Sequence, residues 1–199
     1  PIIGLALLPV LFRLPLVLAP LHIAFLELVI DPACSIVFEA EPGAEDLMRQ
    51  PPRRADEPLL SARHILLSML QGSVVTAAVV GLYAWLLSQP AQAATASTVA
   101  FVVLVAANAA LILPSRSSQT VWRSLWAGLT PVSLWVMGGT LAALTAITTV
   151  PWLANAFRFV PLSPLHWLMA VLAGLGLVVL FAANTQWLRP TTPAQRQLV

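Results

Sequence analysis

The stretch LELVIDPACS, residues 26–35, places two carboxylates and a proline inside an apolar run long enough to cross a membrane. Glu27 and Asp31 are four residues apart, so a helix would carry both on one face. A charge at the centre of a bilayer costs about 2.5–3.5 kcal/mol on insertion scales, and acids in such segments usually face a bundle interior and mark an ion or proton path. The stretch therefore indicates a membrane helix that holds a cation or a proton.

Pro32 follows Asp31 directly. Proline has no N–H group to donate, and its ring pushes against the carbonyl group four residues earlier, here that of Leu28. A carbonyl freed at membrane depth is tolerated where it lines a cavity or binds a ligand. Glu27, Asp31 and the Leu28 carbonyl together form an all-oxygen set, which suits protons or hard cations such as Ca²⁺, Mg²⁺ or Mn²⁺. These three residues are the predicted cation-binding site.

The composition of the whole chain agrees with membrane insertion. Of its 199 residues, 59% are hydrophobic and only 9% are charged, whereas soluble domains carry about 25% charged residues. The net charge of +2 gives no reason to expect nucleic acid as a partner, and the single cysteine excludes an intrachain disulfide. All ten cationic residues are arginines, and all eight acids lie between Glu27 and Glu57.

Apolar runs divide the chain into membrane segments, for which about 20 residues are needed. A first run, residues 1–12, is about half that length and opens without a Met or a basic region, which suggests a cut inside a longer protein. We predict an all-α, polytopic transmembrane helix bundle over residues 1–188, with one truncated and five full membrane helices, followed by a polar tail at 189–199. The five full runs are 18–38, 65–87, 98–114, 129–150 and 165–184.

Connections between the runs predict their pairing and their side of the membrane. The link FRLP, residues 12–15, is short and predicts a tight antiparallel pair of the first two segments. If the long polar loop 39–64 is cytoplasmic, eight arginines lie inside and only Arg13 and Arg158 lie outside, which is the bias found in membrane proteins. We therefore expect an integral protein of the plasma (inner) membrane, with loop 39–64 and the carboxyl terminus in the cytoplasm.

Other polar residues of the apolar runs are weaker candidates for the ion path. Asn108 is the strongest polar group of its run; an amide there most often links helices, but it is a second candidate. Cys34 falls on the face of Glu27, and for it a small buried residue beside the site is favoured over a ligand. His22 is expected at the outer interface. Four glycines are expected to permit close helix contact: Gly138, Gly139, Gly174 and Gly176.

The order of these motifs resembles the carboxyl-terminal membrane domain of P-type cation-transporting ATPases. Calcium pumps of that family have a proline, a helix with an Asn-Leu-Val-Thr-Asp core, and a cytoplasmic loop that ends near Asp-Ile-Met-x-Arg-Pro-Pro-Arg. The similar stretches here are LAPLHIAFLELVIDP, residues 18–32, and EAEPGAEDLMRQPPRR, residues 39–54. Glu27 stands where calcium pumps have Asn, and Ile30 replaces a Thr, so that Ca²⁺, another divalent cation and the proton all stay open as the transported ion.

The resemblance implies that the chain covers the late fifth to the tenth membrane helix of such a pump. Glu27 and Asp31 would then occupy ion-binding positions of the sixth helix, and Pro32 would support the unwound region found there. Loop 39–63 would face the phosphorylation domain. The complete pump would use ATP and Mg²⁺, and phosphorylation would switch the side of access and the affinity of the site.

The phosphorylated Asp-Lys-Thr-Gly sequence, the Thr-Gly-Glu loop and the nucleotide domain of the family are not among these residues. We therefore expect this chain alone not to hydrolyse ATP, and expect its partners to be the transported cation, the lipid bilayer, and the amino-terminal helices and cytoplasmic domains of the pump. The alternative is a free-standing, non-enzymatic multi-pass protein such as a channel or scaffold. An intramembrane hydrolase has no support, because no His-Glu-x-x-His pattern is present.

Overall fold

Helices make up the regular secondary structure of the described part of the chain. The computed structural model describes residues 2–40, 62–89, 93–115 and 130–185, and no strand occurs in these ranges. The all-α prediction is thereby confirmed for them. In chain order the elements are α1 (Ile2–Leu11), α2 (Pro20–Phe25), the π-helix η1 (Leu26–Ile30), α3 (Asp31–Glu39), α4 (Ala62–Ser88), α5 (Ala93–Ser115), α7 (Pro131–Thr149), α8 (Pro151–Ala156) and α9 (Pro164–Thr185).

Several of these helices have the length and apolar character of membrane spans. Among the described residues, four stretches qualify, and each coincides with a predicted run: Pro20–Val37, Ile65–Ser88, Ala93–Leu111 and Pro131–Thr149. The apolar part of α9, Pro164–Leu180, and the helix Ile2–Leu11 are shorter. A polytopic helical membrane protein is therefore supported, whereas the count of six membrane helices stays a prediction.

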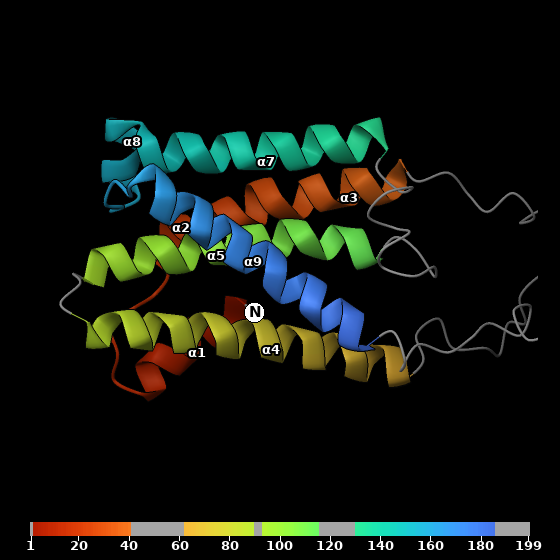
Figure 1. The fold of residues 1–199 in the computed structure, drawn as a ribbon, viewed down its shortest axis with the longest axis horizontal. Helices are drawn as coiled ribbons and strands as arrows, with labels where there is room; N and C mark the ends of the chain where they lie inside the picture. The colour runs from red at the N-terminus through yellow and green to blue at the C-terminus, as the bar shows by residue number, and fades with distance from the viewer. Residues whose placement is uncertain (1, 41–61, 90–92, 116–129, 186–199) are drawn as a thin grey trace, which may run out of the picture.

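Helix α5 forms the centre of the bundle. It packs most extensively against α9 and also contacts α4, α7 and η1, and α9 crosses it obliquely in Figure 1. Residues 100–107 of α5 are all buried. A Cβ atom on Gly174 of α9 would lie 2.5 Å from the Val103 carbonyl oxygen, so the predicted close contact is confirmed there. The other three glycines named above would meet nothing within 4 Å.

Helix α1 packs against α4 instead of pairing with α2. A Cβ atom on Gly4 would lie 2.5 Å from the Thr76 side chain, so the two helices approach closely. The link after α1 also contacts α4, because Tyr83 of α4 is buried and donates a hydrogen bond to the Pro15 carbonyl oxygen at 3.0 Å. The tight antiparallel pair predicted from FRLP is therefore wrong.

The helix ends next to the predicted cytoplasmic segments lie together. In Figure 1 the end of α3, the beginning of α4, the end of α5, the beginning of α7 and the end of α9 share one end of the bundle. Helix α8 and the beginning of α2 lie at the opposite end. This grouping agrees with the predicted division of the connections between two sides of the membrane.

Candidate cation-binding site

The two acids lie on a helical path that runs from Pro20 to Glu39 through α2, η1 and α3. Proline suits the first position of a helix, where no N–H is needed and its fixed φ angle is already helical. Ala19 before it is extended, with φ −80° and ψ 161°. The path therefore begins sharply at Pro20, six residues before Leu26, where the π-helix starts.

The path contains one π-turn, which precedes Pro32. The backbone N–H of Asp31 donates to the Leu26 carbonyl oxygen, five residues earlier, which is the hydrogen-bond pattern of a π-helix. In an uninterrupted α-helix the Pro32 ring would press against the Leu28 carbonyl. The wider turn gives that carbonyl room, and we attribute the interruption at residues 26–30 to the proline.

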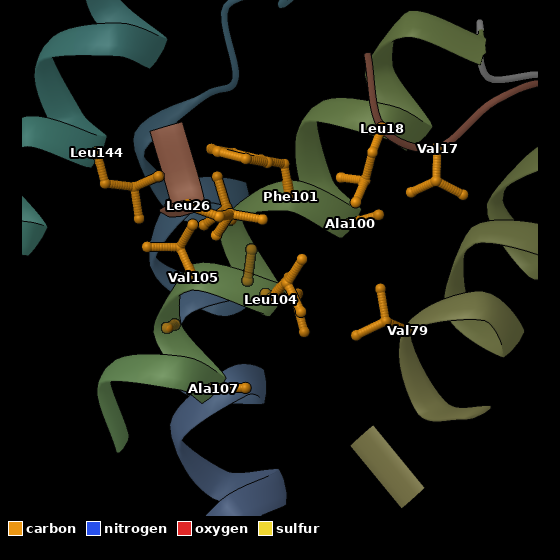
Figure 2. Close-up of a cluster of buried hydrophobic side chains, with 14 of the residues drawn as sticks. Val17, Leu18, Leu26, Val79, Ala100, Phe101, Leu104, Val105, Ala107 and Leu144 are labelled. Carbon is orange, nitrogen blue, oxygen red and sulfur yellow. The ribbon is translucent and has the colours of Figure 1, made fainter. Parts of the chain in front are cut away.

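The π-turn has one apolar side and one acidic side. Leu26 and Ile30 are buried in the core, and Figure 2 shows Leu26 beside Phe101 and Val105 of α5. Glu27 and Asp31 are both exposed. The sequence prediction that both acids share one face agrees with this arrangement, and that face points away from the described helices.

The remaining predicted site residues have different surroundings. Leu28 is 75% exposed and therefore shares the open side of the helix with the acids. Asn108 is half-buried on α5, the helix that contacts the covered side of η1, and among the described residues no recorded contact joins it to an acid. The side chain of Cys34 lies outside the described part of the chain, as do residues 41–61 of the predicted loop and the predicted tail 189–199.

Beside the acid pair, the described part of the chain brings no third side chain of the His, Cys, Asp or Glu type. Within those ranges no three His, Cys, Asp or Glu side chains come close enough to hold a metal ion together. Two carboxylates and nearby backbone oxygens make up the available set. Hard cations of the Ca²⁺ type take six to eight oxygen ligands, so this face could supply one part of a coordination shell.

The sequence of the chain has a match among known protein families. The family profile described as "Cation transporting ATPase, C-terminus" matches residues 15–187. The chain belongs to this family. The resemblance to P-type cation-transporting ATPases noted from residues 18–54 is thereby confirmed, and it extends over the later helices as well.

Individual cation-transporting ATPases share about a quarter of their residues with this chain over the matched region. The protein called "Probable cation-transporting ATPase F" from Mycobacterium bovis is 26% identical over 169 residues, and the protein of that name from Mycobacterium tuberculosis shows the same identity. The matched region covers 83% of this chain and 18% of the relative. This cation-ATPase domain thus spans less than a fifth of the length of these relatives.

A buried histidine anchors the cation-ATPase domain just before the acid pair, and sequence reasoning missed its role. His22 of α2 is 3% exposed. Its Nδ1 accepts a hydrogen bond from the Ala19 N–H at 3.1 Å, and its Nε2 lies 2.8 Å from the Phe157 carbonyl oxygen. Because Nδ1 must accept, Nε2 carries the proton and donates. Both nitrogens are occupied, so His22 holds α2 in place and is not free to bind a metal.

Aromatic rings surround His22 and extend the anchor. The His22 ring stacks on Phe159 with centroids 4.6 Å apart and lies 5.0 Å from the Phe101 ring. The segment after α8 is itself fixed to α5, because the Val160 N–H donates to Thr98 Oγ1 at 3.1 Å. The available sequence signal was a phenylalanine-rich stretch, FRF at 157–159, but it lies too far along the chain to be paired with His22 by periodicity.

Proposed function

We propose that this chain is the ion-binding part of the membrane domain of an ATP-driven cation pump, in which Glu27 and Asp31 supply carboxylate ligands to the transported cation. One observation carries the proposal: in a chain of the cation-ATPase family, two acids share an exposed face of an apolar helix that is interrupted beside them. Acids at membrane depth usually mark an ion path.

The exposure of the acids supports a site shared with other parts of the pump. Both lie within the candidate membrane span Pro20–Val37, and an acidic face turned towards lipid would carry the insertion cost of each charge. Because the relatives are much longer than this chain, we infer that their amino-terminal membrane helices cover this face and complete the ligand shell. The Asn108 amide and Cys34 thiol stay secondary candidates for the same path.

The remaining functions are assigned to the rest of the pump. ATP and Mg²⁺ act in its cytoplasmic domains, and this chain by itself does not hydrolyse ATP. Loop 39–64 lies on the cytoplasmic side of the plasma membrane and links the phosphorylation domain to the site helix. The carboxylates hold Ca²⁺, another divalent cation or a proton, and phosphorylation changes their affinity and side of access.

The experiment uses the full-length pump in proteoliposomes with Glu27→Gln and Asp31→Asn. Phosphoenzyme formation from ATP is measured against increasing Ca²⁺, Mn²⁺ and Mg²⁺ and against pH, together with uptake of each cation. Each variant is expected to lose cation-stimulated phosphorylation by at least about ten-fold, since removal of one charge-assisted ligand costs about 1.5–3 kcal/mol. Gln89→Ala, a change of an exposed polar residue that follows α4, is the control and is expected to behave as wild type. Wild-type stimulation of both site variants would refute the assignment.

A further inference from the structure

The π-turn changes which backbone carbonyl is left without a donor beside the acids. The carbonyl of residue i accepts from the N–H of residue i+4 in an α-helix and of residue i+5 in a π-helix. For Glu27 these positions are Asp31 and Pro32. The Asp31 N–H donates to the Leu26 carbonyl, and proline has no N–H. The main-chain oxygen of Glu27 therefore has neither helical donor.

The neighbouring carbonyl of Leu28 is in a different position. Its α-helical donor would be Pro32, which has none, but its π-type donor would be Ala33, which keeps its N–H. Proline at position 32 thus removes one of the two possible helical donors to the Leu28 carbonyl. For the Glu27 carbonyl, the proline and the π-turn together remove both possible donors. The oxygen that the backbone leaves free lies one residue earlier than the sequence indicated.

The residues around this oxygen lie on the open side of the helix. Glu27, Leu28, Asp31 and Pro32 are all exposed, while Leu26 and Ile30 cover the opposite side. A carbonyl group without a partner at membrane depth is strongly unfavourable, and irregular backbone occurs there where it lines a cavity or binds an ion. The Glu27 oxygen belongs to the residue that also carries one of the two carboxylates, so the three groups sit within one helical turn.

We propose that the main-chain carbonyl oxygen of Glu27 is a third ligand of the transported ion, and that this ion is a hard divalent metal cation and not a proton. The proposal rests on the function proposed above. Two carboxylates balance a charge of +2, and a neutral carbonyl adds a ligand without adding charge, as in protein Ca²⁺ sites. A divalent cation can be coordinated by both carboxylates and the carbonyl oxygen at once, whereas a proton bonds to one oxygen and is shared with one more, so the full set of three oxygens suits a metal cation better.

A backbone ester tests the ligand without changing a side chain. In the full-length pump, Leu28 is replaced by its α-hydroxy analogue, which turns the Glu27 carbonyl into a weaker ester acceptor. The Ca²⁺ or Mn²⁺ concentration for half-maximal phosphorylation is expected to rise about ten-fold, equivalent to about 1.4 kcal/mol. The control replaces Ala24 by its α-hydroxy analogue. That change weakens the Ile23 carbonyl, which accepts the Leu26 N–H, and is expected to leave the half-maximal concentration within about two-fold of wild type.

A second variant tests the π-turn itself. Pro32→Ala returns an N–H at the position that can donate to the Glu27 or Leu28 carbonyl, so we expect the same direction of change in divalent-cation affinity. Pro131→Ala, at the first position of α7 where no donor is needed, is the matched control. Affinities are titrated on the active fraction, so that a lower yield of folded protein does not alter the result.

The outcomes separate this inference from the proposed function. If Glu27→Gln and Asp31→Asn abolish cation stimulation while the ester at 28 and Pro32→Ala both leave affinity unchanged, the carbonyl ligand is refuted and the pump assignment stands. Transport of protons without any divalent cation would refute the metal assignment alone. Wild-type stimulation in both carboxylate variants would overturn the function and the inference together.

Discussion

The Nε2 atom of His22 lies 2.8 Å from the carbonyl oxygen of Phe157, although 135 positions separate the two residues in sequence. This bond joins the start of the acid-bearing helix to the segment that follows α8. Since the other ring nitrogen holds the Ala19 N–H at the beginning of α2, the entry to that helix is fixed while its later part carries the π-turn. The site helix is therefore held from the end opposite the predicted cytoplasmic loop.

Removal of the His22 ring should destabilise the fold. His22→Ala leaves the Phe157 carbonyl and the Ala19 N–H without their recorded partner, and each buried unsatisfied group costs about 1–3 kcal/mol. We expect a clearly lower thermal unfolding temperature in detergent, measured by size-exclusion chromatography after heating. His166→Ala, an exposed histidine, is the control. Equal stability of the two variants would mean that the His22 bonds do not hold the helix.

Two glycines of α9 should respond in opposite ways to the same substitution. In Gly174→Ala the new methyl group meets the Val103 carbonyl oxygen and the Ala106 Cβ at 2.5 and 2.8 Å, and such overpacking costs about 1–3 kcal/mol. Gly176→Ala meets nothing within 4 Å and gains up to about 1 kcal/mol from helix propensity. The same heating assay should show a loss for the first and no loss for the second. A stable Gly174→Ala protein would contradict the close α5–α9 contact.

Arg158 should be replaceable by glycine with a gain in stability. Its φ angle is 55°. This left-handed conformation costs residues other than glycine about 1–2 kcal/mol. The hydrogen bonds of the turn, from the Arg158 N–H to Asn155 and from the Phe159 N–H to Ala154, are those of a Schellman motif, in which glycine usually takes this position. Arg158→Gly should raise the unfolding temperature, and Arg158→Val should lower it. The reverse order would refute this description of the turn.

Labelling should reveal the orientation of the bundle. On a Cys34→Ser background, a single cysteine is introduced in place of Gly43. It should react with a membrane-impermeant maleimide only after the membrane has been permeabilised. A cysteine in place of Arg13 should react in intact cells, because Arg13 lies in a connection that is predicted to face the outside. Labelling of the Gly43 position in intact cells would reverse the proposed topology.

The sequence alone predicted the positions of the helices better than the contacts between them. Four predicted runs coincide with apolar helices of membrane length, because hydropathy is a local property that each segment carries by itself. The pairing of α1 was wrong because it depends on the Gly4–Thr76 contact and on the Tyr83–Pro15 bond, which link distant segments. A short connection limits distance, but it does not decide which neighbour a helix covers.

The candidate site shows a similar division. Glu27 and Asp31 were predicted as ligands from their spacing inside an apolar run, and the structure agrees that they share one exposed face. Their role as ligands stays a prediction. The π-turn was not predicted, because proline indicates an interruption without saying how the hydrogen bonds rearrange. His22 was placed at the outer interface, but it is buried among rings from residues 101, 157 and 159. Its bonds depend on a segment that no local pattern connects to it.

The central place of α5 has a consequence for biosynthesis. The span Ala93–Leu111 is 67% buried, against 17% for Ile65–Ser88, and its most extensive neighbour is α9. Helix α9 leaves the ribosome after α5, so the surface of α5 at Val103–Ala107 has no Gly174 to pack against until translation reaches that residue. We therefore expect closure of the bundle around α5 to be one of the last events of synthesis.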